Sequence, residues 1–316
     1  LLFSGHVDEG LSVVRMILAL TGVPFPETRR DTIAALIKAR LKLKIRGLKF
    51  QPRSIGEIPV NELLRVDTCR AVGIGLSSVD TIRGAVFQTR YLLLALDAGD
   101  PHRIAHALAM ECGYSSVGGP RTPRRTQKLT TEIRRVAATV ATPFAIAYAD
   151  LVEGVAASLE GRWHAGAELL IHAEEQFLEH CTGVTWELGT SRSFGLRCHQ
   201  FRGDIRLMTE RFPPLVRDAQ ERGDRYFATN IVLFSHYVNL AADDPQKMTE
   251  EIEAAIHGWS HAGFHVQHMW HLRAGVENAI YENRGMLAWT KVAQSWRAAR
   301  GSLVARVQFT GIVLEE

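Results

Sequence analysis

Apolar side chains recur every three or four residues along most of the chain, and segments that alternate strictly between apolar and polar residues are rare. Leu151, Val155 and Leu159 form one such stripe, and Leu170 and Phe177 belong to the next. This spacing is typical of amphipathic α-helices, because residues three or four apart share one face of a helix. The sequence therefore predicts an all-α fold.

Helix-breaking turns interrupt this pattern at intervals of about 40 residues, with a helix-sized segment on each side of every turn. An interval of this size predicts stacked helical hairpins, since a single hairpin cannot bury its apolar face alone. We expect residues 60–316 to form one continuous right-handed α-α superhelix of tetratricopeptide-like hairpins, with a period of about 41 residues. The expected turns are Ser77-Ser78, Gly118-Gly119, Arg162, Gly203-Asp204, Asp243-Asp244 and Arg284-Gly285. The expected hairpins are 60–98, 101–140, 143–181, 184–222, 225–262 and 264–300.

Several helix starts are marked by a capping residue. Asp100, Thr142 and Asp244 each stand directly before a proline. A side-chain oxygen at this position accepts a hydrogen bond from a free backbone N–H, and proline at the first helical position has no N–H to leave unpaired. Asp204 is expected to cap its helix in the same way without a proline.

The hairpin 143–181 carries small residues where its two helices are expected to cross. Gly154 lies before the turn, and Gly166 and Ala173 lie after it, with Leu170 between them. Small residues around one large side chain let paired helices approach closely. This arrangement is typical of tetratricopeptide hairpins, whose usual period is about 34 residues, so each helix here should be about one turn longer.

Residues 1–59 depart from the repeat, and we interpret them as irregular helices over 8–22 and 27–47 followed by a basic linker. The segment 38–53 holds seven Lys and Arg and no acidic residue. Alternation over 40–46 favours a strand, whereas the flanking pattern favours a helix. A solvated face or an acidic protein partner is the preferred interpretation of these charges and nucleic-acid binding the less favoured one, since runs of charge usually form solvated faces.

Composition narrows the classes of protein. Apolar residues make up 46% and charged residues 22%, and the net charge is +3, which by itself indicates neither nucleic-acid nor membrane binding. The four cysteines form no C-x-x-C pair, so we expect reduced thiols in a cytoplasmic protein. No apolar run is long enough to span a bilayer. The apolar start 1–3 and the half-hairpin pattern of 303–314 predict a fragment of a longer chain.

Several sequence blocks resemble a known family. The blocks are 5–11, 46–53, 63–69, 82–85, 92–101, 118–121 and 159–163. Together they look like the C-terminal helical-repeat region of large multidomain serine/threonine kinases of myxobacterial type. In that family a kinase domain and an ATPase module precede tetratricopeptide-like repeats. The resemblance implies that this chain is the non-catalytic arm of a bacterial signalling kinase, or a stand-alone relative.

No catalytic residues of that family can be carried over to this chain. The sequence has no V-A-I-K, H-R-D or D-F-G segment of a kinase and no phosphate-binding G-x-x-x-x-G-K-[ST] loop. We therefore expect neither enzymatic activity nor a cofactor. A parent chain could still be a serine/threonine kinase.

A histidine-rich segment is the main candidate for a metal site. His257, His261, His265, His268 and His271 fall within 15 residues, and two of the spacings suit ligands on one helix face. Ala262-Gly263 is expected to break the helix between them, however, and no acidic residue or cysteine completes the set. We predict a histidine-rich surface without a metal, and an enzyme dependent on metal is the third and least favoured function.

The first helix of each hairpin in such arrays lines a concave groove. Projection of the groove positions selects residues at about 13, 10, 6 and 3 positions before each turn. The partner-binding candidates are Tyr148, Arg197, Gln200, Asn230, Tyr237, Trp270, Arg273 and Glu277. Other positions on the same faces are Leu151, Val155, Ser158, Thr190, Ser193, Leu233, Leu240 and Ile280.

Two functions follow from a groove of this kind. The first is a protein-binding regulatory scaffold, because a preformed surface docks a partner without an ordering cost. The alternative is a ligand-sensing arm, like those of helical-repeat transcription activators or signal-transduction ATPases, in which Tyr237 and Trp270 contact a small molecule. A thermal shift on ligand addition that is lost in Trp270→Ala would favour the alternative.

Overall fold

The computed structural model describes residues 7–77, 80–121, 123–260, 263–302 and 304. These residues form fifteen α-helices and two short 3₁₀ helices, η2 (Ile55–Glu57) and η3 (Gly119–Arg121), with no β-strand among them. The all-α prediction is confirmed. No helix in the described ranges has the length and apolar character needed to cross a membrane.

The helices from α3 onward come in antiparallel pairs that fall on the expected hairpins. The first three pairs are α3 (Val60–Gly75) with α4 (Thr81–Ala98), α5 (Pro101–Ser116) with α6 (Pro123–Val140), and α7 (Pro143–Leu159) with α8 (Trp163–His180). The next are α9 (Thr185–Arg202) with α10 (Ile205–Glu221), then α11 (Arg225–Phe234) and α12 (Tyr237–Ala241) with α13 (Pro245–His257), and α14 (Val266–Tyr281) with α15 (Gly285–Gly301).

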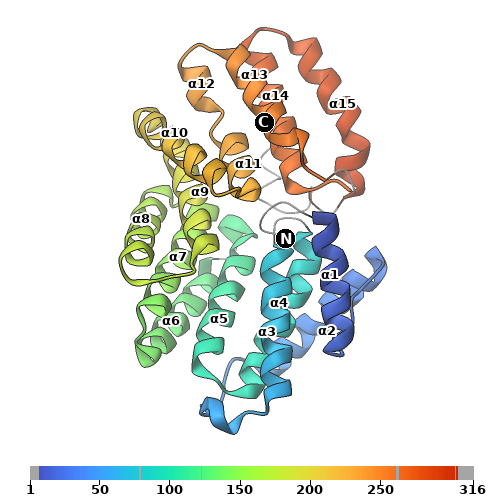
Figure 1. The fold of residues 1–316 in the computed structure, drawn as a ribbon, viewed down its shortest axis with the longest axis vertical. Helices are drawn as coiled ribbons and strands as arrows, with labels where there is room; N and C mark the ends of the chain where they lie inside the picture. The colour runs from blue at the N-terminus through green and yellow to red at the C-terminus, as the bar shows by residue number, and fades with distance from the viewer. Residues whose placement is uncertain (1–6, 78–79, 122, 261–262, 303, 305–316) are drawn as a thin grey trace.

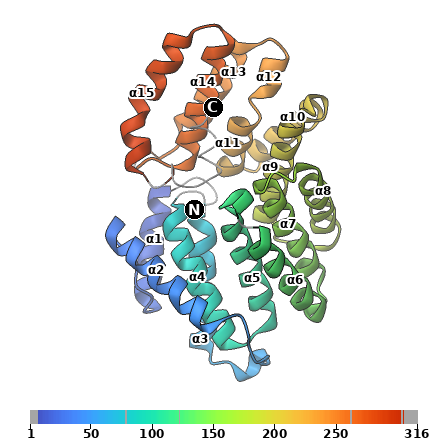
Figure 2. The same cartoon turned by 180° about the vertical axis from the view of Figure 1, so that it is seen from behind.

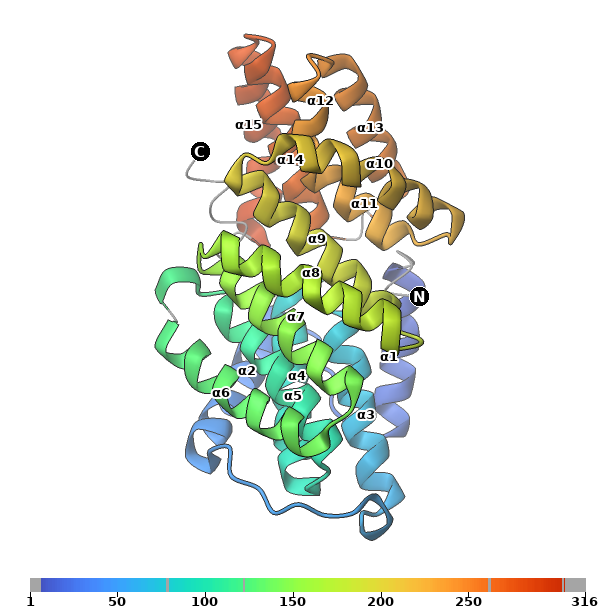
Figure 3. The same cartoon turned by 90° about the vertical axis from the view of Figure 1, so that its left-hand side faces the viewer.

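The pairs are stacked so that one layer of helices lies inside and the other outside. Helices α5, α7, α9, α11 and α14 each contact the next of the series, which makes them the inner layer. Their partners α6, α8 and α10 follow one outer edge of the molecule (Figures 1 and 3). The inner layer thus brings side chains from five hairpins toward a shared space.

The crossing of α7 and α8 explains the small residues there. A Cβ on Gly154 would lie 2.7 Å from Cγ of Leu170, and a Cβ on Gly166 would lie 3.1 Å from Sγ of Cys198. Leu170 and Ala173 are fully buried. The predicted close approach of the two helices is therefore confirmed, and it also places α8 against α9.

The N-terminal helices join the two ends of the described chain. Helix α1 (Val7–Leu20) packs on α3 and also reaches the last hairpins (Figure 2). The Ser260 hydroxyl donates to the Asp8 carboxylate at 3.0 Å, and Val7 belongs to the apolar cluster that holds Trp259 and Val266. The array is consequently curved enough for its first helix to meet its last hairpins.

The alternating residues 40–46 of the basic segment belong to a helix and not to a strand. Helix α2 (Arg29–Arg46) begins at a Thr28 capping box and packs on α4. Two of its arginines face inward: Arg40 donates to Glu111 of α5 at 2.5 Å, and Arg46 donates to Asp97 of α4 at 2.7 Å. Part of the basic charge therefore anchors this element, and only the rest is solvated.

Two local expectations are wrong. The first helix of hairpin 225–262 is not continuous, because it breaks between Phe234 and Tyr237. The Nδ1 of His236 lies 2.9 Å from the Leu233 carbonyl oxygen. In a continuous helix this oxygen would accept a backbone N–H from the next turn. Asp204 stands at the predicted start of α10 but does not cap it; its carboxylate pairs with Nδ1 of His199 at 3.0 Å instead.

The three predicted proline-flanked caps are confirmed. Asp100 accepts from the His102 N–H, Thr142 from the Ala145 N–H and Asp244 from the Lys247 N–H. The expected helical remnant at 1–3, Ser78, His261 and all of the expected half hairpin 303–314 except Val304 lie outside the described residues.

Candidate ligand-binding site

The inner helices enclose a cavity of about 230 Å³, which we call the central cavity. Its walls are mostly apolar and aromatic, as ligand pockets usually are. Side chains from α5, α7, α9, α11 and α14 contribute to it. The principal lining residues are Met110, Tyr114, Tyr148, Leu151, Val155, Trp186, Thr190, Ser193, Phe194, Arg197, Tyr226, Phe227, Asn230, Phe234 and Trp270.

Half of the predicted groove residues meet in this cavity. Tyr148, Arg197, Asn230 and Trp270 come from four different helices and line it together. Four further groove positions, Leu151, Val155, Thr190 and Ser193, do so as well. Projection of helix faces from the sequence thus locates residues that are separated by up to 122 positions in the chain but share one space.

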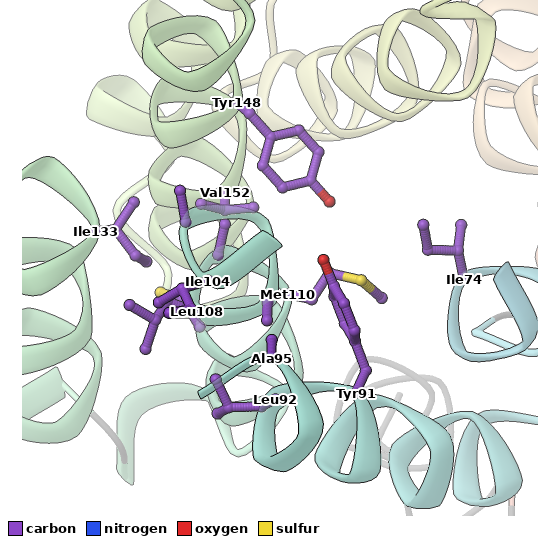
Figure 4. Close-up of a cluster of buried hydrophobic side chains, with 14 of the residues drawn as sticks. Ile74, Tyr91, Leu92, Ala95, Ile104, Leu108, Met110, Ile133, Tyr148 and Val152 are labelled. Carbon is purple, nitrogen blue, oxygen red and sulfur yellow. The ribbon is translucent and has the colours of Figure 1, made fainter. Parts of the chain in front are cut away.

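The aromatic residues are held in place by contacts behind the wall. The ring centroids of Trp270 and Phe234 lie 3.8 Å apart, and Tyr148 stacks on His106 of α5 at 4.4 Å. Figure 4 shows Tyr148 extending from α7 toward Met110 of α5, which also lines the cavity. Rigid aromatic walls of this kind provide apolar contact area at low entropic cost.

Arg197 is the unusual group in the wall. It is only 6% exposed, and its Nε has no hydrogen-bond partner among the described residues. Burial and, to a smaller extent, the nearby charge of Arg273 lower the pKa of the Arg197 guanidinium to about 10. The side chain does lie over the ring of Phe201, 5.4 Å from its centroid. A buried cation without a carboxylate partner is costly, so its position needs an explanation.

The other charged lining residue already has a partner. Asp224 stands at the start of α11 and accepts from the Phe227 N–H at 2.9 Å, which caps the helix. Burial raises the pKa of its carboxyl. Asn230 is also engaged, since its Oδ1 accepts from Nε2 of Gln267 at 3.1 Å. Two buried lining groups are left without a hydrogen-bond partner among the described residues, the Nε of Arg197 and the Tyr148 hydroxyl, and Arg197 is the charged one.

The remaining candidates lie elsewhere. Gln200 is half-buried one turn beyond Arg197 on α9 and does not line the cavity. Tyr237, Arg273 and Glu277 instead form a polar cluster with His236, a residue that the groove projection missed because it assumed an unbroken helix. Tyr237 donates to Glu277 at 2.5 Å, and Arg273 donates to Glu277 at 2.9 Å and to the Tyr237 hydroxyl at 2.8 Å.

This polar cluster joins the helix break to α14. His236 contacts the Leu233 carbonyl with one ring nitrogen and the Glu277 carboxylate with the other. Both contacts are with acceptor oxygens, so a ring nitrogen of His236 that carries a proton can donate to either. Four groups therefore hold one another, and they account for the position of Tyr237 without any external ligand.

The cluster predicts a pH dependence of stability. Burial raises the pKa of Glu277, but the hydrogen bonds of His236 and Tyr237 and the charges of His236 and Arg273 outweigh it, so the pKa is lowered overall. A carboxyl with a lowered folded-state pKa stabilises the fold above its unfolded value near 4.5 and loses that contribution as the pH falls below it. Glu277→Gln should cost about 1–2 kcal/mol at pH 7 and should flatten the decline below pH 4.5. Urea unfolding at several pH values measures both effects.

A larger cleft of about 1130 Å³ separates α10 from α13 on the outer side. Arg225 donates there to the Gly258 carbonyl at 2.8 Å, and Lys247 lies 3.9 Å from Glu251. The described lining of this cleft includes no polar side-chain atom that is both buried and without a partner. The central cavity is therefore the better candidate for a ligand-binding site.

The histidine segment does not assemble a metal site in the described part of the chain. Trp259 donates to Nδ1 of His265 at 3.1 Å, and the His265 N–H donates to Nδ1 of His268 at 2.9 Å. His271 pairs with Glu253 at 3.1 Å. These histidines thus help to order the connection before α14.

Comparisons with known proteins identify no relative. No protein-family model matches the chain, and no curated protein matches it. The resemblance to kinase-associated repeats therefore stays a prediction. The central cavity and the outer surface of the helices are the features of this chain that bear on its function.

Proposed function

We propose that this chain is a non-catalytic regulatory module, a tetratricopeptide-like right-handed superhelix with a period of about 41 residues, which binds a small molecule inside its curve. The serial contacts of α5, α7, α9, α11 and α14 support the superhelix. In the context that the sequence resemblance suggests, the module would be the helical-repeat arm of a bacterial signalling kinase or ATPase.

The enclosure of the groove residues is the observation that carries this function. Tyr148 is 2% exposed, Asn230 5% and Trp270 6%. An extended peptide cannot reach these side chains unless the helices separate. A small molecule can, because a cavity of about 230 Å³ is several times larger than the volume of one water molecule.

Binding in the central cavity would act on the whole array. Its walls come from five consecutive hairpins, so a bound molecule contacts all of them at once. A ligand that binds only the assembled state stabilises that state by mass action and stiffens the helices around it. The proposed output is a change in the stability of the array that neighbouring domains or proteins sense.

The experiment uses 1-octanol as a neutral apolar probe. We expect 1-octanol to raise the melting temperature of the wild-type chain and to bind at one site by calorimetry. Thr190→Trp places an indole in the cavity from half-buried Thr190 and should abolish binding. Leu178→Trp, at an exposed apolar position of α8, is the matched control and should bind like the wild type. Equal binding by both variants would refute the proposed site.

A second function, docking of a protein, is favoured by the outer face of α2. Four large apolar residues stand on it at four-residue intervals and are exposed, namely Ile33 (37%), Ile37 (55%), Leu41 (54%) and Ile45 (87%). The exposed lysines Lys38, Lys42 and Lys44 flank them. An apolar stripe edged by positive charge fits an acidic amphipathic helix.

This second function predicts the effect of a double substitution. Ile37→Glu with Leu41→Glu should remove the capture of a protein partner from cell extract, because both changes place carboxylates on the docking stripe. Thermal stability should change little, since these side chains are exposed. Trp289→Glu on exposed α15 is the control. Unchanged capture by the double variant would show that this face of α2 is not the docking site.

A further inference from the structure

We propose that the ligand of the central cavity is a small amphipathic carboxylate, whose anionic group binds Arg197 and whose apolar body fills the aromatic part of the cavity. This inference rests on the proposed function and adds the chemical class of the ligand to it.

The unpaired guanidinium is the first reason. Arg197 lines the cavity, is almost fully buried and has no carboxylate partner among the described residues. Arg192 on the same helix is paired by contrast, since it reaches Glu174 at 2.8 Å and Asp218 at 3.2 Å. A guanidinium presents a planar fork of donors that matches the two oxygens of a carboxylate. An incoming carboxylate would supply the missing partner.

The charge around the cavity favours an anion over a cation. The charge of Arg273 acts on Arg197 but is itself paired with Glu277, so the unpaired charge in the wall is that of Arg197. The lining carboxylate of Asp224 already accepts the Phe227 N–H as the cap of α11. A cationic ligand beside Arg197 would add a second unpaired positive charge, at a high cost in a desolvated site.

The walls divide into a polar strip and an apolar remainder. Thr190, Ser193 and Arg197 follow one another at three- and four-residue spacing on α9, so they share one face of that helix. Leu151 and Val155 line the cavity from α7, while Phe234 and Trp270 contribute aromatic surface from α11 and α14. A molecule with one charged end and an apolar body matches this division.

Three eight-carbon probes that differ only in the head group test the inference: octanoate, 1-octanol and octylammonium. By isothermal titration calorimetry at pH 7, the wild type should bind octanoate at least tenfold more tightly than 1-octanol and should bind octylammonium most weakly. This comparison needs no variant. If 1-octanol or octylammonium binds as tightly as octanoate, the ligand class is wrong although the cavity remains a binding site.

Variants of Arg197 locate the head group. Arg197→Met removes the charge but keeps an unbranched side chain, and it should weaken octanoate at least tenfold while it leaves 1-octanol unchanged. Arg197→Lys keeps a positive charge but lacks the planar fork of donors. Its affinity for octanoate should lie between those of the wild type and of Arg197→Met. Unchanged octanoate binding by a folded Arg197→Met chain would overturn the inference. Failure of all three probes to bind the wild type would overturn the proposed function as well.

Discussion

Replacing Gly154 with alanine is expected to lower the free energy of unfolding by about 2 kcal/mol. The added Cβ would stand 2.7 Å from Cγ of Leu170 and 3.2 Å from Cβ of Leu169, closer than carbon atoms pack. Neither contact is with the flexible end of a side chain, and Leu170 is fully buried, so α7 and α8 must move apart. This strain exceeds the gain of about 1 kcal/mol that alanine brings to a helix interior.

Gly195 offers the matched control, because it is a helical glycine of α9 with no atom within 4 Å of an added Cβ. Gly195→Ala should therefore stabilise the chain by about 0.5–1 kcal/mol, through helix propensity alone. Urea unfolding followed by circular dichroism measures both variants. Changes of the same sign in the two variants would contradict the close crossing of α7 and α8.

A second substitution shows whether Leu170 is the cause. Leu170→Ala alone should destabilise by about 2–5 kcal/mol, because it leaves a hole in the core. Combined with Gly154→Ala, it removes the atom with which the new Cβ collides. The double variant should then lose less stability than the sum of the two single losses, by roughly 1 kcal/mol or more.

Replacing Arg197 with methionine is expected to raise the free energy of unfolding of the ligand-free chain by about 1–3 kcal/mol. The folded state of the wild type carries a buried guanidinium whose Nε lacks a partner, whereas the unfolded state hydrates it. Methionine has a similar volume and needs no hydrogen bond. A gain in stability that accompanies a loss of binding is typical of residues kept for function.

The control for this prediction is Arg192→Met on the same helix. Arg192 is paired with Glu174 and Asp218, so its removal leaves the mostly buried Glu174 with one partner fewer and should destabilise the chain. Chemical unfolding of both variants without added ligand decides the matter. If Arg197→Met is destabilised as much as Arg192→Met, then Arg197 stabilises the fold, which would contradict a role in binding a ligand.

Much of this fold follows from local signals in the sequence. Proline after Asp100, Thr142 and Asp244 marks helix starts, and the small residues Gly154 and Gly166 mark a crossing, because each acts within one hairpin. The break at His236 could not be predicted in this way, since it depends on a contact with Glu277, 41 residues further on. Asp204 fails as a cap for a different, local reason, because His199, five residues earlier, takes its carboxylate.

The candidate site was predictable to a similar degree. Helix-face projection selects Tyr148, Arg197, Asn230 and Trp270, because the register of each first helix follows from its turn. It also selects Tyr237, Arg273 and Glu277, which pair with one another and not with the cavity. Sequence position cannot distinguish the two sets, since the difference lies in which side chains satisfy one another in space.

The indole resonances of the tryptophans provide the most direct measurement of the central claim. Trp186 and Trp270 line the central cavity, whereas Trp289 and Trp296 are exposed on α15. Titration of ¹⁵N-labelled protein with octanoate should shift the indole signals of Trp186 and Trp270 in a saturable way and leave those of Trp289 and Trp296 in place. Saturable shifts confined to Trp289 and Trp296, or no shift at Trp186 and Trp270, would contradict an internal binding site.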